Sequence, residues 1–279
     1  MPGEILTWLD GAAVDALPLP DRGLEFGDGL FETLLLVDAV PAFLPLHLAR
    51  LQRGLDVLRF PDCIERVEQY LADAVRELAL KNWRYVAVRL TLTRGGGPRG
   101  YAPPQDSRPR CIVRASQIQG DLTVPSAPAR LGECSVRLGS QPALAGLKHL
   151  NRLEQVLCAL EAREQSADDA VMLDQDGNVV CVGTGNLFMV KGRRLLTPPI
   201  IDCGIHGTRR QLVMERWAPS LRHEVVESRF TLQDMRDADE VFYTNSLVGI
   251  RAVRALGELE WCDHPLCTSL FEVYRGELH

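Results

Sequence analysis

"ALAGLKHLNRLEQV", residues 143–156, contains one of only three lysines in a chain of 279 residues. The other two, Lys81 and Lys191, lie at the end of a predicted helix and in a predicted turn, where cations are common. A primary amine at Lys148 can lose its proton in a desolvated site and form a Schiff base, whereas a guanidinium group cannot. The alternative is a surface lysine whose stem covers apolar neighbours. This stretch alone leaves both interpretations open.

The composition limits the classes of protein to consider. With 46% hydrophobic residues and a net charge of -6, the chain can form one large or two modest domains and has no basic patch that would indicate nucleic acid. The N-terminus has no signal-peptide pattern, and no apolar run approaches the ~20 residues that a membrane span needs. We therefore expect a cytoplasmic protein with no nucleic-acid or membrane partner.

Eight cysteines are scattered without a CxxC pair, which is typical of free thiols in a reducing compartment. The stretch "CDHPLC" (262–267) holds four residues that could ligate a metal, but no second cluster elsewhere completes a site. We expect no metal there. Instead, Asp263 is predicted to cap a final helix that has Pro265 in its first turn.

Hydrophobic periodicity predicts helices and strands without a strict βαβ rhythm, and therefore two α+β domains rather than a doubly wound sheet. A polar stretch with Pro and Gly, residues 116–130, is interpreted as a linker between an N-terminal domain (1–115) and a C-terminal domain (131–279). Helices are predicted at 44–60, 63–80, 150–165, 207–218 and 265–276. Strands are predicted at 5–9, 30–37, 85–94, 110–116, 134–138, 223–229 and 240–245, with hairpins at 169–182 and 186–197.

Two segments have features of anion-binding sites. "GGGPRG" (95–100) matches GxGxxG, but the following "YAPPQDSRPR" cannot open the helix that a dinucleotide fold requires. What remains is a Gly-rich loop that presents Arg94, Arg99 and Tyr101 to an anionic substrate, or a flexible hairpin tip. "CGIHGTRRQL" (203–212) places Gly and Thr before a helix, where a phosphate can bind, although many helices begin this way with nothing bound.

These motifs occur together in one order: "DRGLEFGDGLFET" (21–33), "HLARL" (47–51), "LKHLNRLEQVL" (147–157), "GNLFMVKGRRLLTP" (185–198), "CGIHGTRRQL" and "DEVFYTNSLVGI" (239–250). In this order the chain resembles the fold-type IV pyridoxal-phosphate enzymes, the class IV aminotransferase family, over about residues 5 to 253. The resemblance implies two α/β domains with pyridoxal 5'-phosphate (PLP) between them, usually in a homodimer.

The resemblance also implies roles for individual residues. Lys148 matches the lysine that carries PLP, and Arg50 matches the arginine that pairs with its phosphate. Further cofactor contacts at the phosphate match Gly207, Thr208, Arg209, Asn245 and Ser246. On the substrate side, Thr33 matches a threonine near the reacting carbons. Arg99 is the candidate for a substrate carboxylate, with Arg94 and Tyr101 in the same loop.

One position departs from the family pattern. The family places a glutamate five residues before the Asn of "NLF", where its carboxylate holds a proton on the pyridine nitrogen of PLP. This chain has Cys181 there, and a thiol is a poor partner for a pyridinium. Cys181 therefore weakens the expectation of transamination, which needs the full electron sink.

Within the family, "RGGGPRGY" and "LAGLKHLNRLEQVL" are most similar to the aminodeoxychorismate lyase branch. The expected activity is then a PLP-dependent lyase that converts 4-amino-4-deoxychorismate, a small-molecule substrate, to 4-aminobenzoate and pyruvate in folate biosynthesis. Two alternatives stay open: an aminotransferase acting on D- or branched-chain amino acids, and a degenerate, non-catalytic homologue.

Overall fold

The computed structural model describes residues 4–278, which form two compact units. The first unit contains the described chain up to Gly120 together with Leu147–Asn151, and the second contains Asp121–Gly146 and Arg152–Leu278. The sequence analysis placed Lys148 in the C-terminal domain, whereas the structure groups it with the first unit. The reason is that its segment hydrogen-bonds to a strand of that unit: the Phe31 N–H donates to the Lys148 carbonyl (2.9 Å), and the Leu150 N–H donates to the Gly29 carbonyl (3.1 Å).

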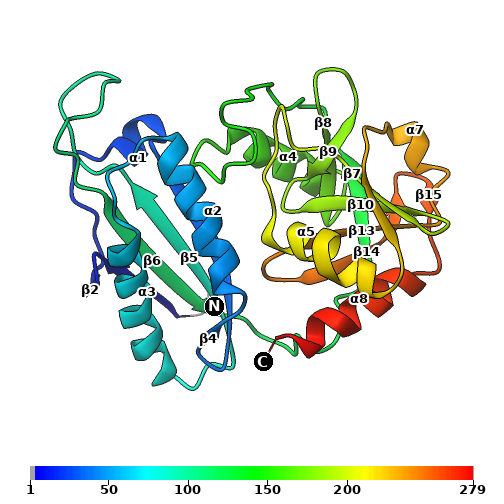
Figure 1. Cartoon of the computed structure of the whole chain (residues 1–279), viewed down its shortest axis with the longest axis horizontal. Helices are drawn as coiled ribbons and strands as arrows, with labels where there is room; N and C mark the ends of the chain where they lie inside the picture. The colour runs from blue at the N-terminus through cyan, green and yellow to red at the C-terminus, as the bar shows by residue number, and fades with distance from the viewer. Residues whose placement is uncertain (1–3, 279) are drawn as a thin grey trace. The chain divides into compact units, whose positions relative to one another are not determined.

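The described part of the first unit is a six-stranded antiparallel sheet with strand order β2-β1-β6-β5-β3-β4. Its strands are β1 (Ile5–Leu9), β2 (Ala12–Ala13), β3 (Gly29–Val37), β4 (Val40–Pro41), β5 (Tyr85–Thr93) and β6 (Arg110–Gln117). Its helices are α1 (Arg22–Phe26), α2 (Leu44–Val57) and α3 (Ile64–Ala79). The helices α2 and α3 pack on one face of the sheet, as the period-3.6 pattern predicts (Figure 1).

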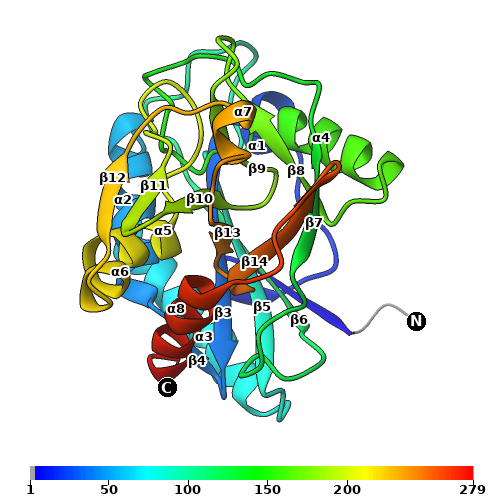
Figure 2. The ribbon, with the colours of Figure 1, turned by 90° about the vertical axis from the view of Figure 1, so that its right-hand side faces the viewer.

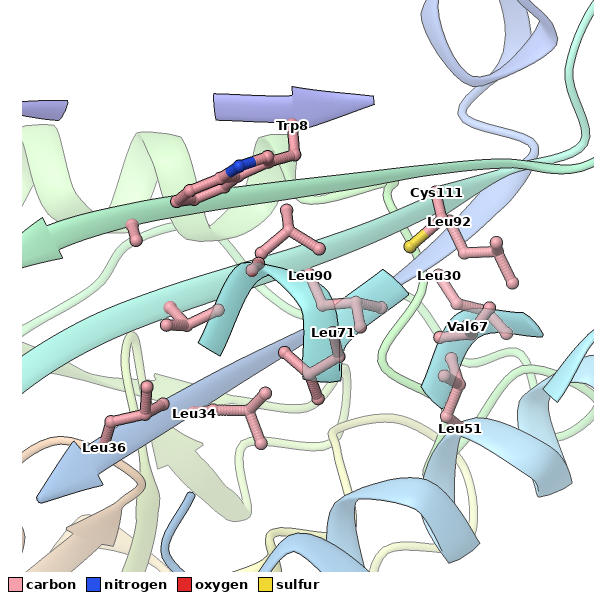
Figure 3. Close-up of a cluster of buried hydrophobic side chains, with 14 of the residues drawn as sticks. Trp8, Leu30, Leu34, Leu36, Leu51, Val67, Leu71, Leu90, Leu92 and Cys111 are labelled. Atoms are coloured by element: carbon pink, nitrogen blue, oxygen red, sulfur yellow. The ribbon is translucent and has the colours of Figure 1, made fainter. Parts of the chain in front are cut away.

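The core of the first unit lies between that face and the two long helices. Alternate residues of β3, including Leu30 and Leu34, point into it and meet Leu51 of α2 and Leu71 of α3 (Figure 3). The intervening residues of β3 point to the opposite face. This alternation decides on which side of the sheet each functional residue of β3 lies.

The second unit has, among its described residues, a nine-stranded mixed sheet with order β12-β11-β10-β13-β14-β7-β8-β9, and β15 pairs with β14. The strands are β7 (Ala129–Glu133), β8 (Asp169–Leu173), β9 (Val179–Val182), β10 (Asn186–Lys191), β11 (Arg194–Thr197), β12 (Glu224–Glu227), β13 (Glu240–Asn245), β14 (Gly249–Leu256) and β15 (Leu259–Glu260). Figure 2 shows β13 and β14 near the centre of this unit, with α8 (Pro265–Gly276) close to β14. The predicted mixture of sheets and helices is confirmed.

Two predictions about the second unit were wrong. Residues 134–138 form no strand, because the strand ends at Glu133 and lies partly inside the predicted linker. The final helix begins at Pro265 as predicted, but Asp263 does not cap it. Its N-terminus is capped through space by the buried carboxylate of Glu240, which accepts hydrogen bonds from the Leu266 and Cys267 N–H groups at 2.8 and 3.0 Å.

The other helices of the second unit are α4 (Leu153–Glu164), α5 (Thr208–Leu212), the π-helical turn η1 (Val213–Trp217), α6 (Ala218–Ser220) and α7 (Leu232–Met235). The predicted helix 207–218 is thus present but contains a π-helical segment. Within residues 4–278 no helix combines the length and apolar character needed to cross a membrane. The same residues contain no group of three or more His, Cys, Asp and Glu side chains that could hold a metal ion.

Candidate active site

Lys148 extends the sheet of the first unit along the edge of β3. His149 pairs with Leu30 in an antiparallel bridge, which places Lys148 opposite Phe31 with both side chains on the same face. The Lys148 Nζ lies 4.2 Å from the centroid of the Phe31 ring, and the Arg89 Cζ lies 3.9 Å from the same centroid. Thr33, two residues after Phe31, also points to this face. Lys148 and Thr33 are therefore on one side of the sheet, as a shared catalytic role requires.

Arg50 is anchored on the opposite face of the same strand. Its Nε and Nη2 donate to the two carboxylate oxygens of Glu32 at 2.8 and 2.5 Å, and the His47 Nδ1 lies 2.6 Å from Glu32 Oε2. All three side chains are at most 5% exposed. His47 and Arg50 lie nearly one turn apart on α2, so one carboxylate meets both.

The sequence analysis missed Glu32 and Phe31. Consecutive residues of β3 thus serve different tasks: Phe31 contacts Lys148, Glu32 holds Arg50, and Thr33 faces the same side as Lys148. A signal for Glu32 was present, because a lone carboxylate inside the apolar run "LFETLLLV" needs a buried partner. Identifying that partner required the packing of α2 on the sheet.

The buried ion pair of Glu32 and Arg50 makes the free energy of unfolding depend on pH at low pH. Burial by itself raises the pKa of Glu32, but the charge and hydrogen bonds of Arg50, aided by His47, outweigh it and lower the pKa from 4.5 to about 2. A carboxyl whose pKa is lower when folded stabilises the protein above its unfolded pKa and loses that contribution as the pH falls through its folded pKa.

We expect the free energy of unfolding to lose about 3 kcal/mol from this group between pH 5 and about 2. Urea unfolding of the wild type and of Glu32→Gln across this range measures it. The difference between the two proteins should shrink as the pH falls. A difference that stays constant from neutral pH to about 3 would show that Glu32 is not held in its ionised form.

The Gly-rich loop between β5 and β6 separates its predicted residues. Arg94 is buried, and its guanidinium donates to the Asp28 carboxylate (2.8 Å) and to the backbone carbonyls of Leu58 and Arg59. This structural role differs from the predicted contact with substrate. Arg99 is exposed and makes no hydrogen bond or ion pair with any residue from 4 to 278, so its guanidinium is available to a ligand. No helix follows the loop, as predicted.

In the second unit the predicted phosphate-binding residues come from two turns that contact each other. The Arg209 Nη2 donates to the Ser246 carbonyl at 3.3 Å, which ties the 207–209 turn to the 245–246 turn. The Asn245 carboxamide oxygen accepts hydrogen bonds from the Leu247 and Val248 N–H groups and so shapes its own turn. The five residues predicted from 203–212 and 239–250 are thus brought together within this unit.

Asn186, the Asn of "NLF", supports the first of these turns. Its amide donates to the Ile205 carbonyl at 2.9 Å, and a Cβ added at Gly207 would lie 2.0 Å from its side-chain oxygen. Any side chain at position 207 would therefore displace Asn186. Next to the second turn, the hydroxyl of Thr244 is buried without a hydrogen-bond partner among the described residues. A phosphate oxygen would satisfy such a group, so these residues fit the phosphate of PLP.

Cys181 does not supply what the family glutamate supplies. It lies in β9 opposite Met172, is 8% exposed, and packs in an apolar cluster with Cys158, Val180 and Ile200. Burial, and then the nearby Asp169 carboxylate, raise the pKa of the Cys181 thiol well above its usual range. The thiol therefore stays neutral and cannot hold a proton on a pyridine nitrogen by charge. The residues therefore fit the contacts that PLP needs at its aldehyde and its phosphate. They do not fit the contact that it needs at its pyridine nitrogen.

Comparisons with known proteins show the family of the chain. The sequence profile of the family described as amino-transferase class IV matches residues 29–256. The chain is 33% identical to an aminodeoxychorismate lyase of Vibrio harveyi over 91% of this chain and 92% of the relative. It is 25% identical to a D-alanine aminotransferase of Bacillus licheniformis over 86% of this chain and 83% of the relative. Among solved structures, the 4-amino-4-deoxychorismate lyase of Pseudomonas aeruginosa is 38% identical, with a TM-score of 0.90 over 98% of this chain and 99% of that chain.

Proposed function

Because the chain belongs to the class IV aminotransferase family, we propose that it is a PLP-dependent lyase that converts 4-amino-4-deoxychorismate to 4-aminobenzoate and pyruvate. The observation that supports this most strongly is the position of Lys148. Its amine lies over Phe31, on the same sheet face as Thr33. The similarity of the whole chain to relatives that are named as this lyase supports the choice of reaction.

PLP, when bound, supplies an aldehyde for Lys148 and an electron sink for the bond that breaks. Lys148 would hold the cofactor through its amine, and the same amine is placed to remove the proton from C4 of the substrate ring. The bond from C3 to the enolpyruvyl oxygen then breaks and the ring becomes aromatic. Lys148, with the Thr33 hydroxyl, delivers a proton to the departing group, which leaves as pyruvate. No water or oxidant is needed for this balance.

The remaining residues bind and orient. Arg99, exposed at the Gly-rich loop, orients a substrate carboxylate. The turns at 207–209 and 245–246 hold the cofactor phosphate in this proposal. Arg50 stays a predicted phosphate contact, and loss of PLP binding in Arg50→Ala would support it.

We also propose a homodimer and a cytoplasmic location. Helix α4 exposes an apolar row at helical spacing, and its members are 45% to 78% exposed: Leu153, Val156, Leu157 and Leu160. A second copy of the chain is the occupant that the family resemblance implies. The described cysteines are all unpaired, which fits a reducing compartment.

The function is tested by incubating the purified, PLP-loaded protein with aminodeoxychorismate and measuring 4-aminobenzoate and pyruvate in equal amounts. A parallel assay supplies D-alanine or a branched-chain amino acid with a 2-oxo acid and measures the new keto acid. Keto acid formation without 4-aminobenzoate would replace the lyase by an aminotransferase. Absence of both products would leave a non-catalytic homologue.

Cys181→Glu tests the weakened electron sink. Since a carboxylate facing the ring nitrogen would stabilise a proton on it, we expect any side transaminase activity to rise more than lyase activity, and the visible absorbance of the bound cofactor to change. Cys181→Ser is the matched control, because it keeps the size and stays neutral. An unchanged spectrum would mean that position 181 does not face the ring. Lyase activity found only in Cys181→Glu would make the natural protein a degenerate member.

A further inference from the structure

The arginine of the motif "DRGLEFGDG", Arg22, binds the Gly-rich loop. Arg22, in α1, is 3% exposed, and its Nη1 and Nη2 donate to the backbone carbonyls of Gly100 and Tyr101 at 3.0 and 2.6 Å. Its Nε donates to Asp28 at 2.9 Å. These two carbonyls immediately follow Arg99, the residue proposed to bind a substrate carboxylate.

The start of the loop is tied to the same carboxylate. Arg94 donates to the Asp28 oxygen that Arg22 also contacts, and the Arg22 backbone N–H donates to the Gly95 carbonyl at 2.8 Å. One carboxylate between two guanidinium groups thus anchors the start of the loop and its middle, at Gly100 and Tyr101, to the α1 segment, beside which the loop lies in Figure 1. The approach is close, because a Cβ at Gly97 would lie 3.1 Å from Arg22 Cδ.

Aromatic rings complete the arrangement. The Arg22 Cζ lies 4.8 Å from the centroid of the Phe26 ring, and that ring lies 5.4 Å from the ring of Tyr101, whose side chain is 85% exposed. Arg22 is therefore fixed by Asp28 and Phe26 before it binds the loop. In contrast, Arg99 makes no hydrogen bond, ion pair or ring contact with the residues from 4 to 278 that would fix it.

We propose that Arg22 is a positioning residue that holds the loop so that Arg99 is preorganised for a substrate carboxylate. This inference rests on the proposed function. A loop released from Arg22 samples many conformations, and substrate binding must then order it again. Arg22 touches neither substrate nor cofactor in this proposal and acts only through the loop.

Kinetics of Arg22→Gln, Arg99→Ala and the double variant test this inference. We expect Arg22→Gln to lower kcat/KM roughly tenfold to a hundredfold, mainly through KM, while cofactor absorbance stays unchanged. If Arg22 acts through Arg99, the double variant should be little worse than Arg99→Ala alone. Multiplicative losses in the double variant would overturn the inference. Arg22→Lys, which keeps the charge but cannot bind two carbonyls as a fork, should repeat the effect more weakly and serves if the Gln variant folds poorly.

Trypsin provides a measurement that needs neither cofactor nor substrate. Cleavage after Arg99 should be roughly tenfold faster or more in the Arg22 variants, because the hydrogen bonds from Arg22 to the Gly100 and Tyr101 carbonyls are lost. Arg110→Gln is the matched control: Arg110 also donates to two carbonyls and one carboxylate, those of Pro18, Pro20 and Asp21, but not to the loop carbonyls. It should be cleaved like the wild type.

If trypsin cleaved the wild type and the Arg22 variants equally fast, Arg22 would not hold the loop. Equally faster cleavage of Arg110→Gln would also overturn the inference. If the wild type made no 4-aminobenzoate, the proposed function would be wrong, whatever the rates of tryptic cleavage are. The two failures are therefore distinguishable.

Discussion

Purified Lys148→Ala should lose its yellow cofactor absorbance, its borohydride-reducible adduct and at least ~10²-fold of its lyase activity. The reason is that one amine is proposed both to carry PLP and to move the proton of the substrate. The position opposite Phe31 on the edge of β3 fixes where that amine can act. No other lysine in the sequence is placed to replace it: Lys81 is ion-paired with Glu4, and Lys191 is exposed at the end of β10.

The two remaining lysines are the matched controls. Lys81→Ala and Lys191→Ala should keep the absorbance, the adduct and the activity of the wild type. After borohydride reduction and proteolysis, mass spectrometry should find the pyridoxyl group on the peptide that contains Lys148. A pyridoxyl group on the peptide that contains Lys81 or Lys191 would show that Lys148 is not the lysine that binds PLP.

Arg50→Ala should destabilise the protein by about 3–5 kcal/mol as well as weaken PLP binding, because it leaves the buried Glu32 carboxylate without its guanidinium partner. Denaturant unfolding without added PLP measures the first effect, and titration with PLP measures the second. The sequence alone predicted only the loss of the cofactor. The ion pair adds a loss of stability that excess PLP cannot fully restore.

Glu32→Leu combined with Arg50→Leu separates these effects. Removing both charges avoids an unpaired buried ion, so the double variant should be more stable than Arg50→Ala, yet it should still bind PLP weakly. If the double variant regained wild-type PLP affinity, Arg50 would not be a phosphate ligand. If Arg50→Ala unfolded like the wild type, the pair with Glu32 would not be formed in solution.

Local sequence patterns were enough to predict many of the helices and strands. Apolar periodicity located α2 and α3, and apolar runs of strand length located β3 and β5, because these signals need only neighbouring residues. The pattern failed where a partner elsewhere in the chain decides the structure. The strand Ala129–Glu133 lies partly in a polar stretch that resembles a linker, and it forms because β14 and β8 flank it.

The sequence by itself determined the motif residues: a lysine among arginines, a Gly-rich loop that cannot open a helix, and a cysteine where the family has a glutamate. Only the tertiary structure decided what these residues contact. It placed Lys148 with the first unit through pairing with β3, and it turned Arg94 into a loop anchor. It also tied Arg50 to Glu32 and buried Cys181 in an apolar cluster. The physical reason is that charge and hydrogen-bonding capacity are properties of a side chain, whereas burial, partners and the face of a sheet depend on residues distant in the chain.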